Sequence, residues 1–451
     1  MTAFAIPIML TGLLQIVYNM ADNIVVGQFS GDPYALGAVG STSSLGNLII
    51  NLLLGTSAGT GVAVAQAYGA KQESIVSRTV HTAMTFSVIG GIAFMLLGLL
   101  ISRPALVLMN TRAEFLDNAT LYLRIVCFGI PASAIYNFGA AILRSIGNSK
   151  LPLIILGSTG LINVGLNILF VAAFNMSVAG VALATIISQY VSAIAVVVVL
   201  IKNKNECYGL NRKRYAFDKK ILARLLRLGI PAGLQSSMFS ISNMLLVSSI
   251  NTLSDISVTA FTIANSIDSI TYTCGNAFFQ AVMTFTGQNY GARNPKRMKK
   301  SLLYGLIQSI ILVFTVGQIE LFFGEKIAGL YISADAVNRA LVIEEVMSLI
   351  SLLLTVYFLC GVMEAFAGFL RGLGYSLIPM INSIVGICGI RILWIIFAFP
   401  TERFHSLRGV MSCYPISWSF TTLLHIAICI FAWIKLKKTD KSLFSDEKKG
   451  K

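Results

Sequence analysis

The sequence is poor in charge and in the side chains that usually build catalytic centres. Only 12% of the 451 residues are charged, whereas 56% are apolar. A soluble domain carries roughly 25% charged residues, so this composition excludes an ordinary soluble globular protein. The three histidines are too widely separated to predict a metal site. The seven cysteines form no Cys-x-x-Cys pair, and we interpret them as small core side chains.

Long apolar runs occupy most of the chain. A membrane-spanning helix needs about 20 apolar residues. Twelve such runs are expected near 3–27, 35–68, 79–101, 119–142, 151–173, 178–201, 228–252, 256–288, 302–322, 341–370, 375–399 and 409–435. We therefore predict an all-α polytopic membrane protein, in which two six-helix bundles surround a central cavity. The expected parts are an amino-terminal bundle (1–201), a basic cytoplasmic linker (202–227), a carboxy-terminal bundle (228–436) and a cytoplasmic tail (437–451).

Basic residues outnumber acidic ones by 34 to 19, and their positions predict the orientation of the chain. If the amino terminus is cytoplasmic, 26 of the 34 basic residues fall in cytoplasmic segments and six in external ones. Such an asymmetry follows the positive-inside rule. We therefore expect both termini in the cytoplasm and no nucleic-acid partner. The first apolar stretch lacks a basic leader, so we predict no cleavable signal peptide.

The two halves of the sequence resemble each other. The motif that begins at Gln66 (QAYGAK) recurs at Gln288 (QNYGAR), and the motif at Leu143 (LRSIGNS) recurs at Leu370 (LRGLGYS). Two weaker matches, Ile6-Pro7 with Ile230-Pro231 and Gly180-Val181 with Gly409-Val410, keep the same order; all four offsets lie between 222 and 229. We infer an internal duplication. Because each half has an even number of helices, the repeats are expected to be parallel.

At these positions the chain resembles the multidrug and toxic compound extrusion (MATE) family of bacterial cation-coupled exporters. The resemblance covers almost the whole length and includes Pro7, Asp22-Asn23, the two Gln-x-x-Gly-Ala motifs, the two Leu-Arg-x-x-Gly motifs and Tyr414-Pro415. It implies two six-helix bundles that operate by alternating access. It also implies a cation or proton site on an Asp of helix 1, a polar pair of helix 5 and a Thr of helix 6. Asp22, Asn163, Asn167 and Thr185 stand at these positions.

The residues themselves support that site. At about 1.5 Å per residue, these four oxygen-bearing side chains lie about 8 to 15 Å from the outer ends of their helices. Asn163 and Asn167 are four residues apart, so they project from one helical face. A carboxylate, two amides and a hydroxyl are suitable ligands for Na⁺ or a proton. The repeat replaces the four residues by Leu246, Ile390, Trp394 and Tyr414. The coupling site is therefore expected in the amino-terminal bundle alone.

The second half has charged residues of its own inside the expected helices. These are Asp268, Glu364 and Arg391. They are expected either to line the substrate cavity, where carboxylates favour organic cations, or to form an internal ion pair between one carboxylate and Arg391. Charged residues at the membrane centre cost roughly 2.5 to 3.5 kcal/mol, so each requires a compensating role.

Together these features predict a monomeric antiporter of the cytoplasmic membrane that exports amphipathic, cationic organic compounds in exchange for H⁺ or Na⁺. No other cofactor is expected. The main alternative is a lipid-linked saccharide flippase of the same superfamily, which would need several basic residues in its cavity. Arg391 is the one basic residue that we expect near a helix centre. A major-facilitator transporter would carry a different loop in place of Gln66–Lys71. An intramembrane enzyme would need clustered catalytic side chains, which the sequence does not provide.

Overall fold

A computed structural model describes residues 1–29, 35–109, 111, 113–332 and 338–447. The described chain is helical throughout, with no β-strand among its elements. Every one of the twelve expected helices coincides with a helical stretch there, although the last residues of the expected tail lie outside the described part. In that same part, eight helices are long and apolar enough to cross a membrane, or nine if one bent helix pair is a single span.

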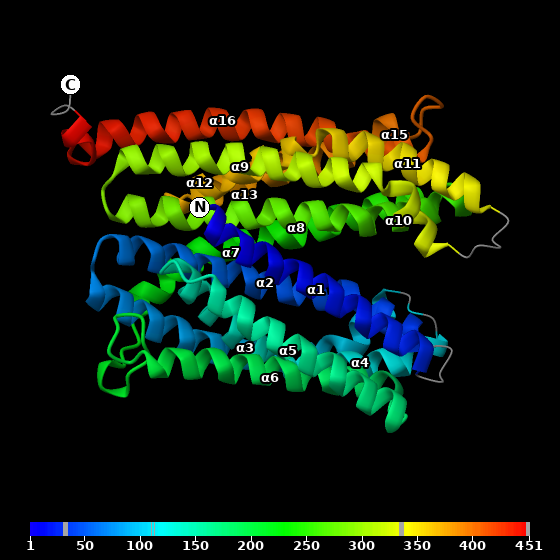
Figure 1. Ribbon diagram of the computed structural model, residues 1–451, viewed down its shortest axis with the longest axis horizontal. Helices are drawn as coiled ribbons and strands as arrows, with labels where there is room; N and C mark the ends of the chain where they lie inside the picture. Colours follow the sequence, from blue (N-terminus) through cyan, green and yellow to red (C-terminus); the bar gives the residue numbers. More distant parts are fainter. Residues whose placement is uncertain (30–34, 110, 112, 333–337, 448–451) are drawn as a thin grey trace. The chain divides into compact units, whose positions relative to one another are not determined.

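The chain forms two compact units. We call Ile6–Ser236 the amino-terminal unit, and Ser237–Lys451 together with Met1–Ala5 the carboxy-terminal unit. The amino-terminal unit contains α1 (Thr2–Phe29) from Ile6 onward, α2 (Ala35–Gly69), α3 (Glu73–Leu108), α4 (Ala113–Ser145), α5 (Lys150–Asn167), η1 (Ile168–Ala173), α6 (Ser177–Lys202), η2 (Arg212–Arg214) and α7 (Lys219–Ile250) up to Ser236. Helix α4 packs against α2, α3 and α6, and α5 runs alongside α6 (Figure 1).

Glycine residues bring α2 and α7 into close contact. Gly55 faces the backbone of Gly233, and Gly59 faces that of Gly229, so that a Cβ atom at either α2 position would overlap main-chain atoms of α7. Small residues permit such close helix packing in membrane proteins. The close contact of α2 with α7 therefore depends on the absence of a side chain at Gly55 and Gly59.

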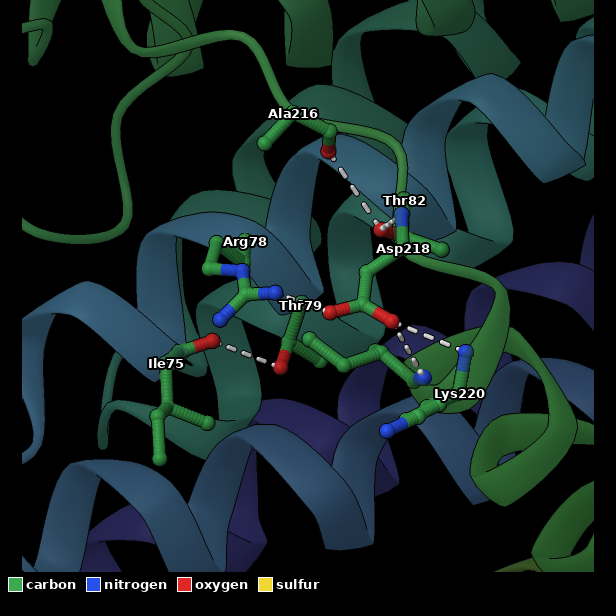
Figure 2. A network of polar contacts seen from close by, with 8 residues as sticks. Ile75, Arg78, Thr79, Thr82, Ala216, Asp218 and Lys220 are labelled. Atoms are coloured by element: carbon green, nitrogen blue, oxygen red, sulfur yellow. Dashed lines mark hydrogen bonds and ion pairs between the residues drawn. The ribbon is translucent and has the colours of Figure 1, made fainter.

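The linker between α6 and α7 is bound to the beginning of α3 (Figure 2). Arg78 forms an ion pair with Asp218, and the Thr82 hydroxyl accepts a hydrogen bond from the Asp218 backbone amide at 3.1 Å. The Asp218 carboxylate in turn accepts from the amides of Lys220 and Ile221, which caps the first turn of α7. The amides of Ile221 and Lys220, together with Arg78, hold the pKa of Asp218 below its ordinary value.

His81, one turn after Arg78 on α3, binds the same linker. Its side chain is buried, and its Nε2 accepts a hydrogen bond from the Asn211 amide at 3.1 Å, while its Nδ1 lies 2.8 Å from the Ser77 carbonyl oxygen. Tyr215 packs edge-on against the imidazole ring. Through these contacts, His81 on α3 helps to hold the linker in place.

The carboxy-terminal unit is centred on α8 (Asp255–Gly291), which packs against α9 (Pro295–Phe322), α11 (Arg339–Val356) and α12 (Phe358–Gly372); α8 and α9 run side by side (Figure 1). Its other elements are the end of α7, α10 (Gly324–Tyr331), α13 (Leu377–Ser383), η3 (Ile384–Gly389), α14 (Ile390–Leu393), η4 (Trp394–Ala398), α15 (Leu407–Met411), α16 (Cys413–Thr439) and η5 (Lys441–Glu447). The expected helix 341–370 is bent by 43° between α11 and α12, at Tyr357.

The backbone repeats the duplication seen in the sequence. Lys71 and Arg293, at equivalent positions after α2 and α8, have φ angles of 56° and 54°. Gly147 and Gly374, at equivalent positions after α4 and α12, have φ angles of 95° and 96°. Positive φ values are uncommon for residues other than glycine, so shared values at equivalent positions indicate shared local structure. The π-helical segments also correspond: η1 begins directly after Asn167, and η4 begins at Trp394, the counterpart of Asn167 in the second half.

Candidate functional site

The amino-terminal unit brings three of its four predicted site residues into direct contact. Asn167, the last residue of α5, donates hydrogen bonds from its side-chain amide to the carboxylate of Asp22 on α1 and, at 3.3 Å, to the amide oxygen of Asn163. Asn167 is fully buried and Asn163 is 6% exposed, while Asp22 is partly exposed. We name Asp22, Asn163 and Asn167 the polar triad.

The polar triad includes one oxygen atom without a partner. The side-chain oxygen of Asn167 is buried and has no hydrogen-bond partner. A buried polar oxygen without a partner is costly, and a water molecule or a metal cation would satisfy it. Asp22 supplies the negative charge beside it. The triad can therefore offer oxygen atoms from a carboxylate and two amides.

Thr185 occupies a separate position in the same unit. It lies on α6, which packs against α5 and η1, but its hydroxyl forms no hydrogen bond with the triad. That hydroxyl oxygen is also buried without a partner. The phenol of Tyr122 on α4, by contrast, is close enough to Asp22 to interact with its charge. Tyr122 was not predicted, because helical periodicity does not reveal which distant residues a side chain of α4 approaches.

The equivalent positions in the carboxy-terminal unit hold a different set of contacts. Leu246 is 1% exposed within the apolar core, and the indole of Trp394 donates to the Gly409 carbonyl at 3.1 Å. The guanidinium carbon of Arg391 lies 3.8 Å from the ring centre of Tyr414, the counterpart of Thr185. A fixed positive charge stacked on an aromatic ring opposes the binding of another cation.

Arg391 does not form the ion pair that was the alternative prediction. Among the described residues it makes no ion pair with Asp268 or Glu364; instead its Nη1 donates to the Asn243 side-chain oxygen at 2.8 Å. The planar guanidinium reaches both an amide oxygen and an aromatic face, which together replace a carboxylate partner. Arg391 is 5% exposed, so these two contacts hold it inside the unit.

The two predicted carboxylates of this unit lie on different helices. Asp268, on α8, lies near Tyr357 at the α11–α12 bend, and its Oδ1 is buried without a partner. Glu364, on α12, is 9% exposed and interacts electrostatically with Arg371 at the end of the same helix. Neither carboxylate forms an ion pair within the described structure.

A third buried carboxylate, Glu320 on α9, was not predicted. It is 5% exposed, and one of its oxygens accepts a hydrogen bond of 2.8 Å from the Thr271 hydroxyl on α8. Its place near the end of an apolar run suggests an interfacial residue in the sequence. The sequence signal was its position three residues after Gly317, which places both residues on one face of α9. In the structure both residues are buried.

The sequence is similar to a known protein family and to named multidrug transport proteins. The family model described as MatE matches residues 7–169 and 231–397. "Probable multidrug resistance protein YoeA" of Bacillus subtilis (strain 168) is 28% identical over 447 residues, which cover 97% of this chain and 95% of that protein. "Multidrug export protein MepA" of Staphylococcus aureus (strain bovine RF122 / ET3-1) is 24% identical over 438 residues, which cover 96% of this chain and 91% of that protein.

Solved structures share the fold. A crystal structure of MATE in complex with MaL6 aligns with a TM-score of 0.88 at 23% identity and covers 97% of this chain and 96% of that chain. A structure described as the outward-facing conformation of a multidrug resistance MATE family transporter of the MOP superfamily aligns with the same TM-score, identity and coverage. At this identity the likeness concerns the fold.

Proposed function

Because this chain belongs to the MatE family, we propose that it is a secondary antiporter that exports amphipathic organic cations in exchange for H⁺ or Na⁺. The family consists of integral membrane transporters rather than enzymes, in agreement with the composition of the chain. Its relatives YoeA and MepA are named as multidrug resistance or multidrug export proteins. Small organic drugs are therefore the substrate class that we propose for this protein.

The observation that carries the proposal is the polar triad in the amino-terminal unit. An ionisable residue within a membrane helix is costly and usually has a functional role. Asp22 is joined to Asn167, whose own oxygen remains without a partner, and the duplicated half of the chain supports the same fold without these side chains. We therefore assign Asp22, Asn163 and Asn167 to the coupling-cation site, with Thr185 as a nearby oxygen donor.

The oxygen atoms of Asp22, Asn163, Asn167 and Thr185 suit a proton or Na⁺ better than a transition metal. Carboxylate, amide and hydroxyl oxygens are hard ligands, whereas zinc and copper favour histidine and cysteine. Within the described residues, no group of three or more His, Cys, Asp or Glu side chains lies close enough to hold a metal ion. Binding of the coupling ion at Asp22 would neutralise its charge, and an ion that binds one conformation more tightly than the other shifts the equilibrium between them.

For the substrate we assign Asp268 and Glu364 of the carboxy-terminal unit as attracting charges and Arg391 as a positioning residue. The two carboxylates form no ion pair in the described structure, which supports a role for their charges in attracting an organic cation. The flippase alternative has less support, because Arg391 is already held by Asn243 and Tyr414.

The test is transport of a fluorescent organic cation in proteoliposomes with proton and sodium gradients imposed separately. One of the two inwardly directed gradients should drive efflux against the substrate gradient. Protein-free liposomes provide the baseline. If neither gradient drives transport, the antiport proposal is wrong. If only compounds with lipid-linked phosphates cross, the flippase alternative replaces it.

A further inference from the structure

Glu320 is a deeply buried carboxylate in the carboxy-terminal unit that the proposed coupling and substrate sites do not use. It lies on α9 and is 5% exposed, and its partner Thr271 on α8 is fully buried. Helix α9 packs against α8, α10, α11 and α12. Glu320 is therefore enclosed by protein on several sides.

One of the two carboxylate oxygens of Glu320 has a hydrogen-bond partner and the other has none. Its Oε2 accepts the bond from the Thr271 hydroxyl, and its Oε1 is buried with no partner. No basic side chain in the described structure forms an ion pair with it, including Lys326 of α10, Arg339 of α11 and Arg371 of α12. An ionised carboxylate in such surroundings is costly unless it is paired. A bound proton removes this cost, because the neutral acid needs no counter-ion.

Asp268 lies close to this carboxylate. It precedes Thr271 by three residues on α8, so the two side chains share one face of the helix. Asp268 therefore lies within one helical turn of the hydroxyl that binds Glu320, and its own Oδ1 is buried without a partner. The thiol of Cys274, also on α8, is the other titratable neighbour of Glu320. Two negative charges this close oppose each other, so ionisation of Asp268 favours the protonated form of Glu320.

We propose that Glu320, with Thr271 as its hydrogen-bond donor, forms a proton-binding site in the carboxy-terminal unit, and that it releases its proton when an organic cation reaches Asp268. The first part stands on the geometry of Glu320. The second part rests on the proposed function, which assigns Asp268 to the substrate site. A cation beside Asp268 cancels the charge that holds the proton on Glu320, so that substrate binding and proton release become linked.

Glu345 provides a matched control. It accepts a hydrogen bond of 2.8 Å from the Ser257 hydroxyl of α8, as Glu320 does from Thr271, but its residue is partly exposed. Ser257 lies eleven residues before Asp268, which is about 16 Å along the helix. Glu345 therefore has the same kind of donor and also one buried oxygen without a partner, but its residue is partly exposed and Asp268 is not nearby.

The first experiment measures proton binding without any substrate. The full chain is titrated in detergent between mildly acidic and alkaline pH, and proton uptake is compared for wild type, Glu320→Gln and Glu345→Gln. We expect Glu320→Gln to take up about one proton fewer per molecule than wild type. Glu345→Gln shows the effect of removing a carboxylate that has the same kind of hydrogen-bond donor but is partly exposed. Equal uptake by Glu320→Gln and wild type would overturn the proton site.

If Glu320→Gln fails to fold, Thr271→Val provides a second test of the proton site. Valine preserves the volume but removes the hydroxyl that stabilises the ionised carboxylate. The proton should then bind about tenfold more tightly, so that its release moves to higher pH. A titration identical to that of wild type would contradict the role of Thr271 and the site with it.

The second experiment uses tetraphenylphosphonium, an aromatic cation, in weakly buffered solution. Its binding is measured by calorimetry, and proton release is followed with an indicator dye. Wild type should release protons on binding, and Glu320→Gln should bind the cation but release fewer. If the cation binds to both proteins with equal proton release, the link between Glu320 and Asp268 is wrong. If wild type does not bind the cation, the proposed substrate class fails, while the first titration still decides the proton site.

Discussion

Asn167 donates a hydrogen bond from its side-chain amide to the carboxylate of Asp22, which lies 145 residues earlier in the chain. This contact joins α1 to the end of α5, where the helix changes to the π-helical segment η1. Single π-helical turns inside helices often occur at functional sites. Here, however, the repeat also contains a π-helical segment at the equivalent position, so the backbone belongs to the shared scaffold. The side chains, rather than the backbone, distinguish the two halves.

Asp22→Asn is expected to abolish gradient-driven export while leaving membrane insertion and substrate binding largely intact. Asparagine has nearly the same volume and can still meet Asn167, but it neither takes up a proton nor neutralises a cation. The measurement is substrate efflux from liposomes at several imposed gradients with matched amounts of protein. Trp394→Ala, at the repeat counterpart of Asn167, serves as the control and should leave the cation dependence unchanged. Export with wild-type gradient dependence in Asp22→Asn would refute the assignment.

Asn167→Ala should weaken coupling more mildly than Asp22→Asn. It removes the amide that joins Asp22 and Asn163 but leaves the carboxylate in place. If the coupling ion is Na⁺, the variant loses one neutral oxygen ligand, so that Na⁺ should bind roughly tenfold more weakly and a higher Na⁺ concentration should restore the rate. If it is H⁺, the variant loses the amide that stabilises the ionised Asp22 carboxylate, so that the proton should bind more tightly and a higher pH should restore the rate. The same efflux assay checks this, and a loss that neither a higher Na⁺ concentration nor a higher pH restores would contradict it.

Neutralising the carboxylates of the carboxy-terminal unit should change substrate preference. Asp268→Asn or Glu364→Gln is expected to weaken the binding of organic cations about tenfold and that of neutral compounds much less, because a charge attraction is lost while apolar contacts remain. Binding of a cationic dye and of an uncharged dye of similar size can be compared by fluorescence. Equal losses for both dyes would show that the carboxylate has a structural role instead.

The orientation of the chain follows from loop charge alone and remains a prediction. A reporter that is active only in the cytoplasm should work when fused after Lys451 or inserted near Lys213, and it should be silent when inserted near Thr111. The physical reason is the excess of basic residues in the segments that we place inside. An active reporter near Thr111 would contradict both the orientation and the number of spans before it.

The contact between Asp218 and Arg78 should protect the linker from proteolysis in a pH-dependent manner. Because folding lowers the pKa of Asp218, its contribution to stability is present above the ordinary aspartate pKa and is lost as the pH falls below it. Asp218→Asn should therefore make trypsin cleave after Lys213 or Arg214 severalfold faster near neutral pH. The effect is modest because the pair is partly exposed.

Two comparisons make that result specific. Glu206→Gln lies in the same linker, and Glu206 forms no ion pair in the described structure, so this variant should behave as wild type. Pepsin at acidic pH should cleave wild type and Asp218→Asn at similar rates. At such pH the Asp218 carboxyl of the wild type is protonated in both the folded and the unfolded linker, so it no longer forms the ion pair. A constant difference between the two proteins at every pH would argue against the ion pair.

The sequence predicted those features that depend on local composition. Apolar length places the helices, and the matching motifs at Gln66 and Gln288 reveal the duplication, which the similar φ angles of Lys71 and Arg293 repeat in the backbone. The spacing of Asn163 and Asn167 was also enough to place them on one face. In each case the information lies within a few turns of one helix or in a direct comparison of two segments.

Tertiary structure alone decided which side chains meet. The partners of Arg391 are Asn243 and Tyr414 instead of a carboxylate, and Glu320 reaches Thr271 on a neighbouring helix. Such contacts depend on the rotation of each helix about its axis and on the crossing of neighbouring helices. Hydropathy does not encode either quantity, because lipid-facing and protein-facing surfaces of these helices are both apolar. Only the packed helices show which buried polar atoms find partners and which remain available to a proton or a cation.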